Sequence, residues 1–134
     1  MEFDNKYFDV FKFSNDQVTK NFNNATKDLR IAKEVKILEV KFNYAYIALI
    51  KAGIALASYY SRRMKNVPGH HVKIIEQMAR ILGDDSVADI GNVMRSKRNI
   101  DLYAGGIEVT EKETREYIEF VNTVIAKVKK LLSK

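Results

Sequence analysis

Residues Phe42 to Tyr60 read FNYAYIALIKAGIALASYY, and this stretch decides the fold that the sequence predicts. It holds nineteen residues with a single charge, Lys51, near the centre. A lysine at that depth would cost roughly 2.5–3.5 kcal/mol in a bilayer, and Asn43 and Gly53 weaken a membrane span further. The segment would carry apolar residues on most of its faces as a helix. We therefore expect a central helix from about Lys36 to Lys65, buried in the protein's own core.

Helical periodicity continues on both sides of this segment, and no stretch alternates well enough to predict a sheet. Ser14 with Gln17, and Thr110 with Glu113, form capping-box patterns, in which each side chain satisfies a free backbone N–H at a helix start. Proline and glycine residues separate the helical stretches. We therefore expect an all-α, antiparallel bundle of about five helices. Its predicted helices span residues 15–34, 36–65, 70–82, 86–103 and 111–132.

Residues 1–13 form an aromatic N-terminal extension ahead of a single bundle domain, residues 14–134. Its aromatic residues recur at helix-like intervals: Phe3, Tyr7, Phe8 and Phe11. The first interpretation is a short extra helix that covers the bundle, and a dimer contact is the alternative.

Composition limits the classes of function. The chain of 134 residues has no cysteine, which excludes disulfides, thiol catalysis and thiolate metal sites and fits a reducing cytosol. The first residues lack the basic start and apolar run of a secretory signal, so we expect a cytoplasmic protein that does not enter a membrane. A net charge of +6 favours contact with nucleic acid, although solubility is the simpler explanation.

The most informative segment is RSKRNIDLY, Arg95 to Tyr103, at the end of the fourth predicted helix. At 3.6 residues per turn, Arg98 and Asp101 lie on the apolar stripe of that helix. Charged residues are rarely buried unless they are paired. Either the two form an ion pair that anchors the bundle, or they line a groove together with Arg95, Asn99 and Tyr103.

This segment resembles the signature of the HEPN family, whose members are short helical bundles that usually dimerise. In that family an Arg is followed by a polar residue, often Asn, and by a His a few residues further on. Arg98 and Asn99 match the first half of the signature, and Tyr103 stands where the His is expected. The stretch YAYIALIKA, Tyr44 to Ala52, resembles the second helix of the family. The stretch PGHHVKII, Pro68 to Ile75, resembles the entry into its third helix.

The resemblance implies a metal-independent ribonuclease site at a dimer cleft, with Arg98 and Tyr103 as catalytic residues. Arginine pairs well with phosphate, and a histidine, with a pKa near ~6.5, can accept and donate a proton. Tyrosine, with a pKa of about 10, is a poor base, so whether the chain is an enzyme stays open. The only histidines, His70 and His71, are interpreted as helix-entry or surface residues, with replacement of the missing motif histidine as the alternative.

The leading functional interpretation is an RNA-associated HEPN-like module, one component of a toxin–antitoxin or defence pair, with impaired or absent RNase activity. Arg95, Asn99 and Asp101 are its expected binding residues, and we expect no cofactor and no metal. A homodimer and a nucleotidyltransferase-like partner protein are implied by the resemblance. The alternatives are a non-catalytic protein-interaction module and an active endoribonuclease that uses Arg98 and Tyr103.

Overall fold

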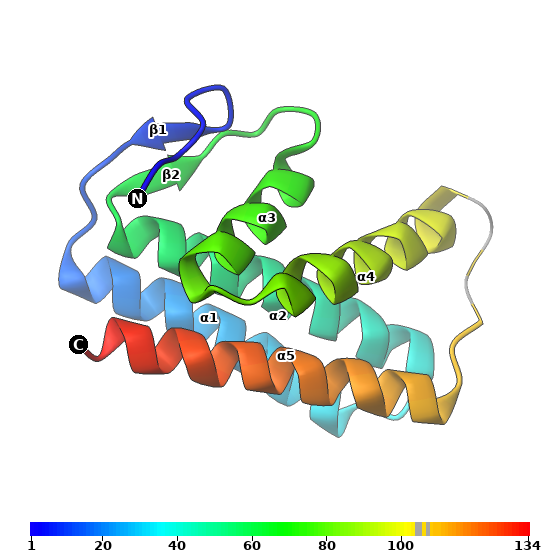
Figure 1. Cartoon of the computed structure of the whole chain (residues 1–134). Helices are drawn as coiled ribbons and strands as arrows, with labels where there is room; N and C mark the ends of the chain where they lie inside the picture. The colour runs from blue at the N-terminus through cyan, green and yellow to red at the C-terminus, as the bar shows by residue number, and fades with distance from the viewer. Residues whose placement is uncertain (104–105, 107) are drawn as a thin grey trace.

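The structure is a computed structural model, and it describes residues 1–103, 106 and 108–134, with side chains for all of these except residues 100–103. The expected all-α bundle is confirmed (Figure 1). In chain order its elements are β1 Phe8–Val10, α1 Asn15–Glu34, α2 Leu38–Tyr59, β2 Arg62–Met64, α3 His70–Leu82, α4 Asp85–Tyr103 and α5 Glu111–Leu132.

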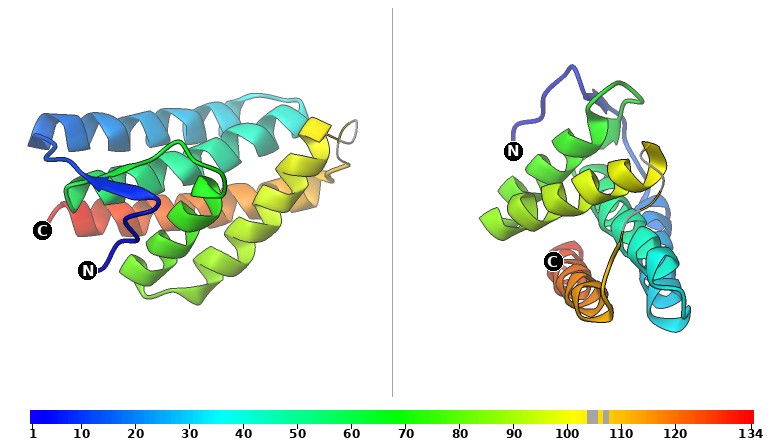
Figure 2. Two further views of the ribbon diagram at one scale, coloured as in Figure 1. Left: turned by 90° about the horizontal axis from the view of Figure 1, so that it is seen from above. Right: turned by 90° about the vertical axis from the view of Figure 1, so that its right-hand side faces the viewer.

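The helices form two layers. The long helices α1, α2 and α5 lie side by side, with α1 antiparallel to the other two (Figure 1). The shorter pair α3 and α4 forms a helical hairpin that packs across α2 (Figure 2). Helix α2 therefore contacts every other helix and is the central element, as its apolar sequence predicts.

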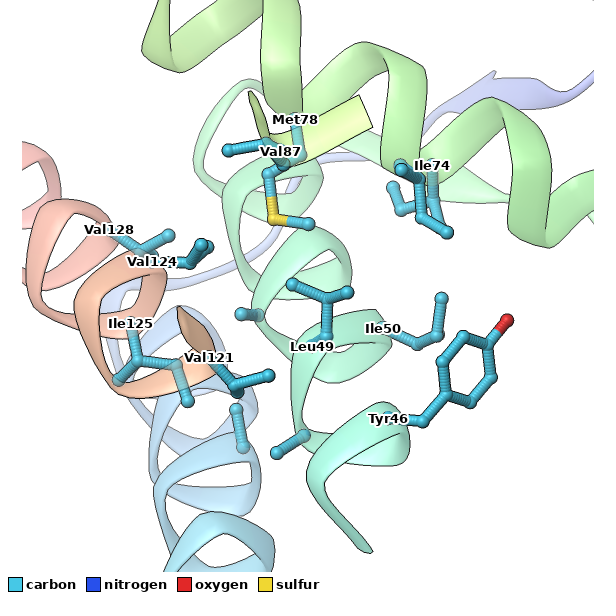
Figure 3. Packing of buried hydrophobic residues seen from close by; sticks show 14 of the residues in the cluster. Tyr46, Leu49, Ile50, Ile74, Met78, Val87, Val121, Val124, Ile125 and Val128 are labelled. Carbon is cyan, nitrogen blue, oxygen red and sulfur yellow. The ribbon is translucent and has the colours of Figure 1, made fainter. Parts of the chain in front are cut away.

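The packing of α2 explains how its apolar stretch from Phe42 onward accommodates a single charge, Lys51. Phe42, Tyr46 and Leu49 are fully buried there, against aliphatic residues of α3, α4 and α5 (Figure 3). The Lys51 ammonium lies 2.6 Å from a carboxylate oxygen of Asp28 on α1, whose side chain is only 5% exposed. Within the described residues α2 is the one helix long and apolar enough to cross a membrane, and 61% of its most apolar window is buried inside the protein.

The N-terminal segment corrects two expectations, because it forms a strand and not a short helix. β1 pairs antiparallel with β2, with Phe8 opposite Met64, so α2 ends at Tyr59 and not near Lys65. Phe8 is 3% exposed and belongs to the core cluster, and Phe3 packs edge-on against it at 5.1 Å between ring centroids. Helix-like spacing over so few residues is a weak signal. Here β2, which follows α2, provides hydrogen-bond partners for an extended segment, so the segment forms a strand.

Two helix starts follow the predicted patterns. Both capping boxes are present, at Ser14 and at Thr110. At the start of α4, for which no capping box was predicted, the Asp84 carboxylate accepts hydrogen bonds from both the backbone N–H and the hydroxyl of Ser86. Asp84 also pairs with Lys127 of α5 at 2.6 Å, which ties the start of α4 to the other layer.

Two glycines allow α3 to approach its neighbours closely. A Cβ atom on Gly53 of α2 would lie 2.7 Å from Ile74 Cγ1, and one on Gly91 of α4 would lie 2.8 Å from Ile75 Cγ2. Real Cβ atoms do not come so close, so the glycines set the separation of the three helices. That separation brings the start of α3 against the second half of α4.

Candidate functional site

A tight turn fixes the start of α3 and the first of the two histidines. Gly69, the residue before the helix, has φ 82°, a left-handed conformation that favours glycine. The backbone N–H of His70 bonds to the Val67 carbonyl at 3.2 Å, and its ring Nδ1 lies 2.7 Å from the same oxygen. His70 is therefore held by both its backbone and its side chain.

The second half of α4 faces this turn across an open cleft of about 640 Å³. Arg95, Arg98 and Asn99 line the cleft from α4, and both histidines line it from α3. The remaining wall is the turn itself, residues 66–69, with Val72. Two cationic side chains, two amides and two imidazoles thus share one cavity.

Tyr46 of α2 lies in the core behind the cleft and contacts two of the residues that line it, His71 and Arg98. Its ring is fully buried, and its hydroxyl points away from the aliphatic cluster (Figure 3). That hydroxyl lies 3.0 Å from Nδ1 of His71. The guanidinium of Arg98 lies over the Tyr46 ring, 5.6 Å from its centroid, which is within the range of a cation–π contact. Tyr46 therefore links the arginine of α4 to the histidine of α3.

Burial and positive charge hold His71 neutral. Burial is the largest cause that lowers the pKa of His71 from 6.5 to about 4. The neighbouring His70 and the guanidinium groups of Arg98 and Arg95 lower this pKa further. Burial also raises the pKa of Tyr46 to about 12, although the two arginines oppose that shift. At neutral pH the site thus contains a neutral imidazole and a neutral phenol beside two cations.

The predicted site residues fall into two groups. Arg95, Arg98 and Asn99 come together in the cleft; Arg98 is partly buried over the Tyr46 ring, and Asn99 is exposed. Arg95 is oriented by a hydrogen bond from its Nε to the Asn92 amide oxygen at 3.4 Å. The side chains of Asp101 and Tyr103, the other two predicted site residues, lie outside the described part of the structure.

Sequence reasoning gave His71 little weight and missed Tyr46. Adjacent residues of a helix point in different directions, which argues against joint use of the two histidines at a metal. The start of a helix is less constrained: both rings face the same cleft, 4.5 Å apart between centroids. Tyr46 shares one face of the helix with Phe42, Leu49 and Ile50, which was a usable signal, because a phenol on a buried face needs a hydrogen-bond partner.

Within the described part of the chain, no group of three His, Asp or Glu side chains could hold a metal ion. Comparison with protein-family models, curated proteins and solved structures finds no match to this chain.

Proposed function

We propose that this chain is an RNA-associated module of the HEPN type, whose cleft between α3 and α4 holds the phosphate backbone of a single RNA strand. One observation carries the proposal: Arg95 and Arg98 line the same cleft, beside Asn99 and two imidazoles. Guanidinium groups pair with phosphate through two parallel hydrogen bonds, and neutral polar groups beside them can contact ribose or base.

Titration of a labelled single-stranded RNA at several salt concentrations tests this proposal. Each phosphate contact contributes about −0.7 to the slope of log affinity against log salt for a single strand. We expect Arg98→Ala to weaken binding by about tenfold and to reduce the slope by about one contact. The matched control is Arg30→Ala, an exposed arginine on α1 in the other layer, which removes the same charge and should leave affinity nearly unchanged.

Absence of RNA binding by the wild-type protein, or equal losses in the Arg98 and Arg30 variants, would refute the proposal. Absence of binding would favour the non-catalytic alternative, a protein-interaction module with a partner such as a nucleotidyltransferase-like protein. A toxin–antitoxin or defence pair fits either outcome, and the chemistry of the cleft does not distinguish toxin from antitoxin.

A second candidate, an active metal-independent endoribonuclease, is favoured by the two imidazoles beside Arg98. A base for the ribose hydroxyl and a cation for the phosphate are the groups that such cleavage needs. This candidate uses a histidine of α3 for the proton, where the sequence suggested Tyr103. Cleavage of RNA by wild-type protein, lost in both Arg98→Ala and His70→Gln and retained in Tyr103→Phe, would support it.

A homodimer remains part of the proposal on the strength of the family resemblance alone. The aromatic N-terminal residues no longer argue for it, because Phe3 and Phe8 pack inside the chain. Among the described side chains of α4, Val93 is an exposed aliphatic residue, 48% exposed, that a second copy of the chain could cover. Light scattering of wild type and Val93→Glu should show a dimer that the substitution dissociates, whereas a wild-type monomer at high micromolar concentration would contradict the expectation.

A further inference from the structure

We propose that His70 and His71, fixed in opposite tautomers, recognise the ribose 2′-hydroxyl and so let the cleft distinguish RNA from DNA, with Tyr46 as the positioning residue. This inference rests on the proposed function, because it concerns the same cleft. It adds a specificity that the two arginines cannot provide, since phosphate is common to both nucleic acids.

The tautomer of His71 follows from the burial of Tyr46. A buried phenol O–H must be donated, and the His71 Nδ1 atom lies 3.0 Å from the Tyr46 oxygen. If Nδ1 accepts that hydrogen bond, the ring proton of the neutral imidazole resides on Nε2. Nε2 lies on the side of the ring away from Tyr46, so His71 offers an N–H donor to the cleft.

The tautomer of His70 follows from a different partner. A backbone carbonyl can only accept, so the 2.7 Å contact between His70 Nδ1 and the Val67 oxygen requires a proton on Nδ1. The Nε2 atom of neutral His70 then carries a lone pair. The two neighbouring rings, 4.5 Å apart between centroids, thus provide one donor and one acceptor.

A hydroxyl group satisfies such a pair, whereas phosphate does not. The oxygens of a phosphodiester only accept hydrogen bonds. The lone pair on His70 Nε2 is also an acceptor, so it would face another acceptor with no proton between them. The 2′-hydroxyl of ribose is both donor and acceptor on one oxygen, and it is the group by which a protein can tell RNA from DNA. It also neighbours the 3′-phosphate of the same nucleotide, which suits a site with Arg95 and Arg98 in the same cavity.

Tautomers can be measured directly, because the chain holds only two histidines. Nitrogen-15 NMR of the imidazoles at pH 7.5 should show the Nδ1–H form at His70 and the Nε2–H form at His71. Tyr46→Phe keeps the ring and removes the hydroxyl, and it should turn His71 into a mixture of tautomers without changing His70. Tyr44→Phe, which removes a half-exposed hydroxyl from the same helix, is the matched control and should change neither.

Binding is compared with three oligonucleotides of one sequence that carry 2′-hydroxyl, 2′-fluoro or 2′-deoxy sugars. The fluoro sugar keeps an RNA-like conformation but cannot donate a hydrogen bond, so it separates sugar shape from the donated proton. We expect the hydroxyl strand to bind about tenfold more tightly than either of the others. In Tyr46→Phe this ratio should fall by about three- to tenfold.

Equal tautomers at the two histidines, or a ratio unchanged by Tyr46→Phe, would overturn the inference. Recognition of base edges in place of ribose would appear as sequence preference with equal affinity for the hydroxyl and deoxy strands, and it would also overturn it. Binding of all three strands with equal affinity, weakened equally by Arg98→Ala, would leave the proposed function intact while removing this specificity. Binding of no strand would remove both.

Discussion

The stability of this protein should depend on the protonation of His71, and the expected effect is large enough to measure. The perturbation is a decrease in pH from 7.5 to 4.5, applied to wild type and to His71→Gln. In the folded protein the pKa of His71 is about 4, whereas in the unfolded chain it should be close to 6.5. Between these values the unfolded state binds more protons, so the free energy of unfolding falls as the pH decreases from 6.5 toward 4.

The magnitude follows from the difference between the two pKa values. One pKa unit corresponds to about 1.4 kcal/mol, so an unscreened shift from 6.5 to 4 would remove about 2.6 kcal/mol of stability at pH 4.5. The ring lines an open cleft, where solvent weakens the interaction with the neighbouring charges. We therefore expect wild type to lose about 1–2 kcal/mol more than His71→Gln over this pH range.

Urea unfolding at four pH values between 7.5 and 4.5 measures this difference directly. Hydrogen bonds hold the pKa values of Asp84 and Glu113 below their usual range, so these carboxylates contribute at lower pH and equally in both proteins. Arg98→Ala removes one of the charges that lower the pKa of His71, and it should reduce the pH dependence without abolishing it. Equal losses in wild type and His71→Gln would refute the conclusion that the folded protein keeps this imidazole neutral.

Three further predictions concern stability and can be checked by thermal or urea unfolding. Arg98→Ala should cost less than about 1 kcal/mol, because Arg98 lies over an aromatic ring at the cleft; a loss of 3 kcal/mol or more would mean that it anchors the bundle. Lys51→Met should cost about 2–3 kcal/mol, because it leaves the buried Asp28 carboxylate without its cation, and an unchanged midpoint would contradict this. Gly91→Ala should cost about 1–3 kcal/mol despite the better helix propensity of alanine, because the new methyl group meets Ile75 in the core; a stabilised variant would show that the helices can separate.

Sequence pattern predicted the helices because their signals are local. The two capping boxes depend on residues three apart, and the stripe of α5 depends on spacing within one helix. The β1–β2 pair was missed because neither three-residue strand has a recognisable pattern alone. The pair places Phe8 opposite Met64, and both α1 and α2 lie between these residues in the sequence. Such a contact can be inferred only once the packing of both helices is known.

The candidate site divides in the same way between local and long-range information. Arg95, Arg98 and Asn99 lie within five positions on one helix, so spacing alone predicts that they share a region of its surface. Arg98 contacts Tyr46 of α2, and Tyr46 in turn contacts His71 of α3. No local pattern predicts that contact, because it depends on how closely α3 can approach its neighbours.

That approach connects the core to the chemistry of the cleft. Gly53 and Gly91 let α3 lie so close to α2 and α4 that its first turn contacts the Tyr46 hydroxyl and faces Arg98 across the cleft. In the sequence, Tyr103 stands where the family signature that this segment resembles has a histidine. In the folded chain an imidazole nevertheless faces the arginine, from another helix. The side chains that line the cleft beside this segment are therefore decided by packing contacts far from it, here those of Gly53 and Gly91 with α3.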